Sequence, residues 1–214
     1  MILDLHVHTV LSGDAKPTAG EYAERAMELR ENYGIDGFVI TEHRYWSESR
    51  YEELADLSMK TGLVILQGVE LETDYGHILV YGVTPEFVDK VDISTRTNGL
   101  AVVETALATG GFPVPAHPGR PMVGCGIALR ALNGIRAIEH LNGGNNEAEN
   151  RRAQMWMEEF GLYGIGGSDA HFINDLGICL TAFENSIRDD AGLAKELANG
   201  NYHAIHLKEA KGAR

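Results

Sequence analysis

The first strand-like segment of the chain carries alternating residues that could bind a metal ion. Residues 2–8 read Ile-Leu-Asp-Leu-His-Val-His. The strand period of two places Asp4, His6 and His8 on one face and apolar residues on the other. Two imidazoles two positions apart at a strand end can reach one metal ion, and Asp4 could orient one of them. The His-x-His pattern alone is equally compatible with two half-exposed polar residues.

Further imidazole and carboxylate groups follow other short apolar segments. Each such segment reads as a buried strand, so these polar residues would lie at strand ends. Any one of them could be an ordinary solvated side chain, but one face of a barrel would gather them all. They are His43 after 37–41, Glu70 at the end of 63–70, His77 at the start of 77–82, His117 after 111–115, and Asp169 and His171 after 162–166.

This set of residues suits a divalent metal better than a protein nucleophile. Histidine and carboxylate ligands without thiolates favour Zn²⁺, Mn²⁺ or iron, and carboxylates commonly bridge neighbouring ions. Cys125 follows a glycine-rich turn and Cys179 lies in an apolar segment, so we interpret both as structural. The sequence shows no nucleophile elbow and no active-cysteine motif.

The elements that must position these residues alternate between short apolar runs and segments of helical periodicity. That alternation predicts βα units, hence an α/β barrel or an open doubly wound sheet, in one domain over 1–214 without internal repeat or linker. A complete eight-fold barrel usually needs ~250 residues, so a chain of 214 favours a reduced or distorted barrel. Strands are predicted at 2–8, 37–41, 63–70, 77–82, 111–117, 137–140, 162–166, 178–183 and 202–206, and helices at 21–32, 52–60, 100–109, 126–132, 147–160 and 191–198.

Composition and net charge argue against some kinds of binding partner. The chain has nine histidines, two cysteines and a formal net charge of −13. The acidic surface argues against binding long nucleic acid. No apolar run is long enough to cross a bilayer, so no membrane partner is expected, and two cysteines without a signal-peptide pattern favour the cytoplasm.

Five short motifs, in this order along the chain, together resemble those of the PHP (polymerase and histidinol phosphatase) superfamily. They read Asp-Leu-His-Val-His-Thr at 4–9, Thr-Glu-His at 41–43, Gly-Val-Glu at 68–70, Ala-His-Pro-Gly-Arg at 116–120 and Gly-Ser-Asp-Ala-His at 167–171. The resemblance implies a distorted (β/α)7 barrel with up to three metal ions at the carboxyl ends of its strands, and hydrolysis of phosphoesters. Glu42 departs from the commoner Asp at a position that is not an expected ligand.

The resemblance also implies which residues hold two to three divalent ions, of zinc, manganese or iron. Asp14 occupies a position where some members carry His, and the spacing before His77 varies in the family. The first ion would be held by His6, His8, Glu70 and Asp169, the second by Glu70, His77 and His117, and the third by Asp14, His43 and His171.

Catalysis at such a centre would use a hydroxide that the metal ions generate from water at neutral pH. Asp169 or His171 could pass a proton to the leaving alkoxide. The planar guanidinium groups of Arg44 and Arg120 match phosphate, and Arg120 is also a candidate catalytic residue.

A Glu-x-x-Asn element at 139–142 also resembles the family. We expect Glu139 and Asn142 to support the ligands or to contact substrate, with Asn142 a candidate phosphate-binding residue. His140, His203 and His206 are interpreted as packing or surface residues.

These observations favour a metal-dependent phosphoesterase that acts on a small phosphorylated metabolite, with a nucleotide as the favoured case. Within the same class, an exonuclease on short oligonucleotides and a histidinol-phosphate phosphatase remain open. From another class, an amidohydrolase-type C–N hydrolase also uses His-x-His on a first strand, although such sites commonly bridge their metals with a carboxylated lysine. The sequence leaves the native metal, the ester and the oligomeric state open.

Overall fold

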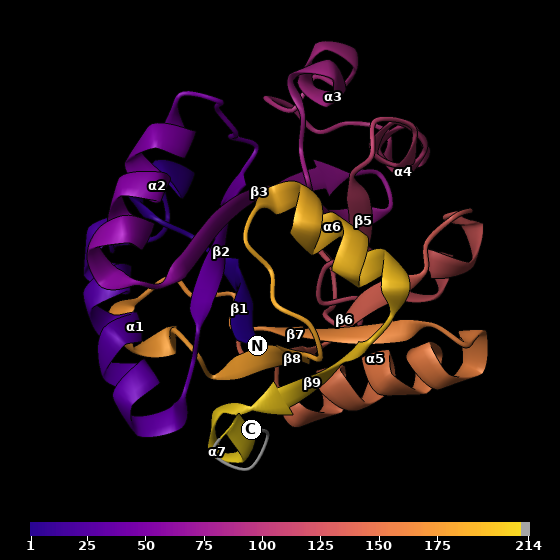
Figure 1. Cartoon of the computed structure of the whole chain (residues 1–214). Coiled ribbons are helices and arrows are strands. Elements are labelled where there is room, and N and C mark those ends of the chain that lie inside the picture. Colours follow the sequence, from indigo (N-terminus) through magenta and orange to yellow (C-terminus); the bar gives the residue numbers. More distant parts are fainter. Residues whose placement is uncertain (211–214) are drawn as a thin grey trace.

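A computed structural model describes residues 1–210 as a curled mixed sheet with helices packed around it (Figure 1). Seven strands form the main sheet in the order β5-β4-β3-β2-β1-β8-β9, and β6 and β7 form a second, two-stranded sheet. The strands are β1 (Ile2–Val7), β2 (Gly37–His43), β3 (Val64–Thr73), β4 (Gly76–Tyr81), β5 (Phe112–Pro115), β6 (Ala137–Asn142), β7 (Tyr163–Gly167), β8 (Cys179–Phe183) and β9 (Tyr202–His206).

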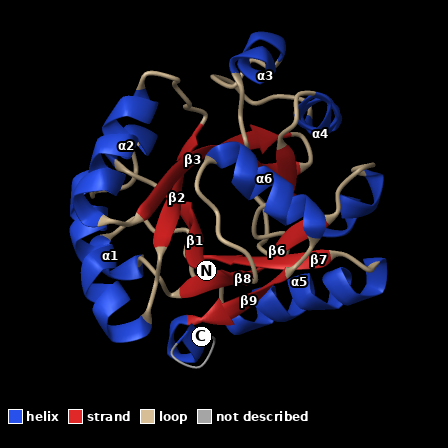
Figure 2. Ribbon diagram, in the orientation of Figure 1, coloured by secondary structure: helices blue, strands red, loops and turns tan. Residues whose placement is uncertain are grey.

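The helices lie outside the strands, as Figure 2 shows. Sequence signals explain where they begin and end: Thr18 and Glu21 form a capping box at the start of α1, and Gly34 ends that helix with a left-handed φ of 81°. The α-helices are α1 (Ala19–Tyr33), α2 (Arg50–Thr61), α3 (Pro85–Lys90), α4 (Gly99–Ala108), α5 (Glu147–Phe160), α6 (Asp190–Asn199) and α7 (Leu207–Ala210), and the 3-10 helices are η1 (Val10–Ser12), η2 (Gly126–Ala131) and η3 (Ile173–Asp175).

The first three strands are parallel, and α1 and α2 connect them. Val7 packs in one apolar cluster with Tyr22 of α1, whereas Leu3 and Leu5 pack in another. This strand is therefore buried on both faces, as its neighbours on either side require. The carboxyl ends of the three strands meet at one edge.

The predicted distorted (β/α)7 barrel is confirmed only as a mixed α/β fold with a curled sheet. Only two residues, Asp74 and Tyr75, separate β3 from β4, so β4 returns antiparallel to β3, and β5 pairs antiparallel to β4. A parallel pair would need a crossover of a dozen or more residues, which this turn cannot supply. Strand β8 also runs antiparallel to β1. The mixed α/β fold is confirmed, but the main sheet forms a half-barrel.

The short sheet of β6 and β7 lies against both β5 and β1. Its junction with β1 is marked by two backbone hydrogen bonds, from the His8 amide to the Ala170 carbonyl (3.0 Å) and from the Ala170 amide to the His6 carbonyl (3.2 Å). The loop that follows β7 is thereby fixed beside the end of β1. None of the helices within residues 1–210 is long and apolar enough to cross a membrane.

Candidate metal centre

All nine predicted ligands gather where β1, β2, β3, β5 and β7 end and β4 begins. The β1 residues decide the first ambiguity of the sequence, because the side chains of His6 and His8 are both 0% exposed and are not half-exposed polar groups. Asp4 is also buried, but it does not orient either imidazole. Its carboxylate accepts hydrogen bonds from the backbone amides of Ser168 (2.9 Å) and Gly177 (2.8 Å), which anchors the loop after β7 to β1.

Four side-chain atoms converge on one point between β1, β3 and the end of β7. The Nε2 atom of His6 lies 3.5 Å from both Glu70 Oε2 and Asp169 Oδ1, and the Nε2 atom of His8 lies 3.4 Å from the same two oxygens. Ligands about 2.1 Å from a tetrahedral metal are separated by about 3.4 Å. The spacing of these four atoms therefore fits one bound ion.

The other oxygen of the same carboxylate belongs to a second group. Glu70 Oε1 lies 3.0 Å from His77 Nδ1 and 3.0 Å from His117 Nε2. His77 reaches this position because the hairpin returns β4 beside β3. Glu70 thus faces one donor set with each oxygen, which is the arrangement of a bridging carboxylate.

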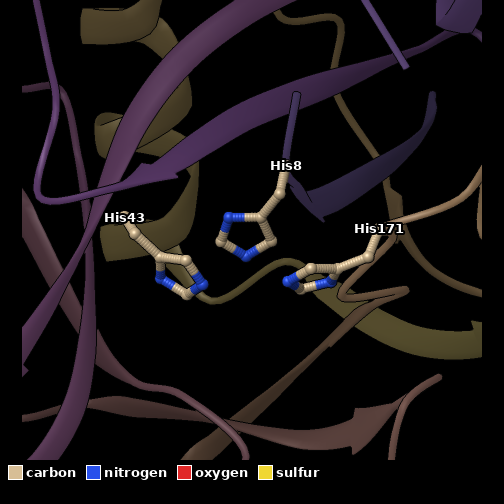
Figure 3. A group of neighbouring side chains, drawn as sticks. All are labelled: His8, His43 and His171. Atoms are coloured by element: carbon tan, nitrogen blue, oxygen red, sulfur yellow. The ribbon is translucent and has the colours of Figure 1, made fainter. Parts of the chain in front are cut away.

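A third group surrounds Asp14 in the loop after β1. Asp14 Oδ2 lies 3.4 Å from His43 Nε2 and 3.5 Å from His171 Nε2, and the Asp14 side chain is 56% exposed. Figure 3 shows His43 and His171 on either side of His8, and ring nitrogens of the three lie within 4.8 Å of one another. The third donor set is therefore the most open of the three to solvent.

The buried polar atoms of this centre fit a divalent metal. His6 Nε2, His8 Nε2 and Glu70 Oε2 are buried without a hydrogen-bond partner within the described residues. Glu70 Oε2 also lies 2.9 Å from His43 Nδ1. Buried polar atoms without a partner are costly, so His6 Nε2 and His8 Nε2, which face the same two carboxylate oxygens, indicate a missing ligand. Nitrogen and carboxylate donors are the set that zinc, manganese and iron accept.

The carboxylate of Glu139 supports two of these ligands from behind. It lies 2.9 Å from His6 Nδ1 and accepts a 2.8 Å hydrogen bond from the backbone amide of His117. Asn142 donates to the same carboxylate at 2.9 Å. A carboxylate behind a ligating imidazole fixes its tautomer and raises its basicity. Glu139 therefore contacts two predicted ligands from behind, which is the geometry that the first of its two predicted roles needs.

Charge is concentrated and mutually compensated in the pocket. Burial would raise the pKa of Glu70, but the imidazoles of His6, His117 and His43 hold it well below its usual value. Burial lowers the pKa of His6, but the Glu139, Asp169 and Glu70 carboxylates more than offset it and raise that pKa. Burial lowers the pKa of His8 to about 4. An uncharged His8 is the form that can bind a metal.

Two of the predicted ligands have backbone conformations that are rare for residues with a Cβ. His117 has φ of 29° and Asp169 has φ of 55°. Both follow strands that end at the pocket. Left-handed φ at non-glycine residues costs free energy and is concentrated at functional sites.

Two of the residues predicted to contact substrate, Arg120 and Asn142, bind each other, and Arg120 also binds the predicted ligand Asp169. Arg120 Nη1 lies 2.8 Å from Asp169 Oδ2, and its other nitrogens donate to Asn142 Oδ1 and Asn145 Oδ1, both at 2.8 Å. Asn142 is itself buried, and its side-chain oxygen accepts from both Arg120 and the Gly144 amide. Asn145 gave no signal in the sequence.

Arg44 differs from Arg120, because its side chain is 45% exposed and its ion pair with Glu72 is 3.5 Å long. Its guanidinium could therefore turn to a ligand at little cost. Cys125 and Cys179 are buried free thiols, and His140, His203 and His206 lie in none of the three donor groups, so the structural interpretation of these five residues agrees with their positions.

Comparisons with known proteins bear on this centre. A family model described as PHP-associated matches residues 147–202, which include Asp169 and His171. The fold matches a protein from Bifidobacterium adolescentis assigned as a metal-dependent phosphoesterase, with a TM-score of 0.62 and 18% identity over 92% of this chain and 96% of that one. It also matches the lesion-specific endonuclease PfuEndoQ from Pyrococcus furiosus, with a TM-score of 0.65 and 18% identity, over 96% of this chain and 58% of the endonuclease.

The PHP-associated match is confined to residues 147–202, the part of the chain that carries the Gly-Ser-Asp-Ala-His motif. It agrees with the resemblance that the five motifs carry, and the structural neighbours include a protein assigned as a metal-dependent phosphoesterase and a lesion-specific endonuclease. The fold is also shared with PsfC from Pseudomonas syringae, with a TM-score of 0.72 and 21% identity over 99% of this chain and 93% of that one. An amidohydrolase from Chromobacterium violaceum has the same fold at a TM-score of 0.65 and 19% identity, over 98% and 99% of the two chains. No curated protein matches the chain.

Proposed function

We propose that this protein is a PHP-type phosphoesterase that hydrolyses a small phosphorylated metabolite, with a nucleotide as the favoured substrate, at a trinuclear metal centre. The observation that carries the proposal is the position of Glu70. Its two oxygens face two separate donor sets, and the third set adjoins the first through His8. Bridged divalent ions are typical of phosphoester hydrolysis.

Metal ions bound here would supply a hydroxide at neutral pH and neutralise the phosphate oxygens. The chain's own residues have distinct tasks. His6 and His8 present Nε2 to the pocket, and Glu139 holds the His6 ring. Asp169 presents one oxygen to the pocket and is held by Arg120 through the other.

Proton transfer to the leaving alkoxide is assigned to His171 or Asp169. The His171 ring is partly exposed and its Nδ1 lies 2.9 Å from the Asp169 backbone carbonyl, so a proton is held on that nitrogen. Its Nε2 faces Asp14 at the solvent-exposed side of the centre. His171 can carry the transferred proton on Nε2 only while that nitrogen is not bound to the third metal ion, and the proton then exchanges with water.

A small substrate fits the charge of the protein. The formal net charge of −13 opposes a long polyanion, but bound divalent ions would place positive charge inside the pocket. Arg44, with its exposed guanidinium, is the residue available to bind a phosphate oxygen or a second phosphate.

The test is a panel of phosphorylated metabolites, mononucleotides and dinucleotides, assayed with Mn²⁺, Zn²⁺ and Fe²⁺ in turn. We expect release of inorganic phosphate from a mononucleotide or a similar monoester. The His77→Gln variant removes a donor from the second group and should lose this activity, which ties the activity to the metal centre. The proposal is wrong if no phosphoester is cut under any metal while the protein is folded.

Two other outcomes of the same panel are informative. Cleavage of short oligonucleotides without mononucleotide turnover would favour the exonuclease alternative, which the endonuclease neighbour makes worth testing. Histidinol phosphate is included in the panel, because its cleavage alone would favour the histidinol-phosphate phosphatase alternative. Turnover of an amide or ring C–N bond alone would favour the amidohydrolase class, whose fold the chain shares.

A further inference from the structure

A chain of hydrogen bonds runs behind His8 and involves residues with no role in the proposal above. His8 Nδ1 lies 3.0 Å from Ser12 Oγ, in the 3-10 turn after β1. Ser12 Oγ donates to Glu42 Oε2 at 2.6 Å. The same Ser12 oxygen accepts a 3.1 Å hydrogen bond from the backbone amide of His43. Ser12 therefore touches two of the metal-ligand residues and one buried carboxylate.

At the end of this series of hydrogen bonds, the Glu42 carboxylate accepts from four donors. Glu42 is buried, and besides Ser12 it accepts from the Thr9 backbone amide at 3.0 Å, from the Thr9 hydroxyl and from Arg50 Nη1 at 3.1 Å. Arg50, at the start of α2, is also buried, so the pair is charge-balanced. An ionised carboxylate only accepts hydrogen bonds. The direction of each bond is thereby fixed.

The protons available in this series of hydrogen bonds determine the tautomer of His8. The one hydroxyl proton of Ser12 is given to Glu42, and the amide of His43 can only donate. Ser12 Oγ must then accept from His8, so the proton of the neutral imidazole lies on Nδ1. The lone pair of Nε2 is left facing Glu70 Oε2 and Asp169 Oδ1, each 3.4 Å away.

We infer that Glu42, acting through Ser12, is a positioning residue that holds His8 in its metal-binding tautomer. The inference rests on the proposed metal centre. It gives a task to the residue at which this chain departs from the commoner Thr-Asp-His motif. His6 is oriented by the Glu139 carboxylate directly, whereas His8 is oriented by a hydroxyl that a second glutamate orients in turn.

The first measurement reads the tautomer in the metal-free protein. Long-range ¹H–¹⁵N correlation spectra of chelator-treated protein near pH 8 distinguish protonated from unprotonated ring nitrogens, and a His8→Gln variant assigns the signals. We expect Nδ1–H for His8 in the wild type and in Ser12→Thr, which keeps the hydroxyl. Ser12→Ala and Glu42→Gln should gain the Nε2–H form, while His6 stays unchanged as an internal reference.

The second measurement is zinc affinity by competition with a chromophoric chelator. Ser12→Ala and Glu42→Gln should bind the tightest ion about 10- to 100-fold more weakly, the range for loss of such a supporting contact. Ser58→Ala is the matched control, because Ser58 accepts one backbone hydrogen bond, from Ile65 at 3.2 Å, outside the site.

Ser12→Ala is a small change in a half-buried turn, so it covers the case in which Glu42→Gln does not fold. The inference is overturned if folded Ser12→Ala keeps His8 as Nδ1–H and binds zinc within twofold of the Ser58→Ala control. A wild type that binds zinc but cleaves no phosphoester would contradict the proposed function alone. A wild type that binds no zinc would contradict both the metal centre and this role of Glu42.

Discussion

Replacing the Glu139 carboxylate by an amide should uncouple the metal ligands from their support. Three donors face this carboxylate: His6 Nδ1 at Oε1, and the His117 amide and Asn142 Nδ2 at Oε2. A glutamine offers one acceptor oxygen and one NH₂ group. Whichever way the amide is turned, its NH₂ group meets a donor or forces the His6 proton onto the nitrogen that should bind metal.

The magnitude follows from the loss of one charge-assisted hydrogen bond at full burial. Such bonds contribute about 1.5–3 kcal/mol, which corresponds to about 10- to 100-fold in metal affinity. The assay is competition for Zn²⁺ with a chromophoric chelator, with metal content measured by mass spectrometry. Glu104→Gln, on the exposed face of α4, is the control for the change of charge.

A folded Glu139→Gln protein that binds zinc within twofold of the Glu104→Gln control would refute this reasoning. Circular dichroism and thermal melting decide whether the variant is folded. If Glu139 instead contacts substrate, the variant would keep its metal and raise only KM. The two roles expected from the sequence are thereby separated.

Three further predictions concern other parts of the fold. Arg120→Met should weaken metal binding as well as activity, because Arg120 holds Asp169, whereas Arg44→Met should raise KM at unchanged metal content; equal metal content in both would contradict this. Burial raises the pKa of Asp190 from 3.8 to about 6, so the folded state binds this proton more tightly than the unfolded state does. The free energy of unfolding therefore falls as the pH rises from 4 to 6. Asp190→Asn should therefore raise the unfolding free energy, relative to wild type, by about 1–3 kcal/mol more at pH 7.5 than at pH 4.5, and a pH-independent difference would count against it. Tyr81 donates a 3.0 Å hydrogen bond to a β1 carbonyl, so Tyr81→Phe should lower the urea-unfolding free energy by about 1 kcal/mol without changing metal content.

The donor set could be predicted because its signal is local. Alternation in β1 predicts His6 and His8 on one face. The structure keeps this, although an irregularity between Asp4 and Val7 places Val7 in a different apolar cluster from Leu3 and Leu5. Glu70 and His77 lie on the two strands of a hairpin whose turn has two residues, so their proximity also follows from short-range geometry. The helix over 147–160 was predicted with the bounds that the structure gives it, since Asn146 and Gly161 cap it clearly.

The interactions behind the ligands could not be predicted, because they join residues far apart in the chain. Nothing in the sequence around Arg120 indicates that its guanidinium will bind Asp169 and Asn145. The link from Glu42 to Ser12 depends on how the turn after β1 lies over β2. The half-barrel was missed for a related reason: helical and apolar periodicities do not report strand direction, which the tight turn before β4 reverses.

The proposed function makes the phosphoesterase activity of this protein depend on metal ions bridged by Glu70. The most direct test is to strip the purified protein with chelator and titrate Mn²⁺ or Zn²⁺ back while measuring phosphate release and bound metal per chain. We expect negligible activity in the stripped protein and recovery that saturates above one ion per chain, with Glu70→Gln recovering neither activity nor the second ion. Full phosphatase activity in the metal-free protein would contradict the claim.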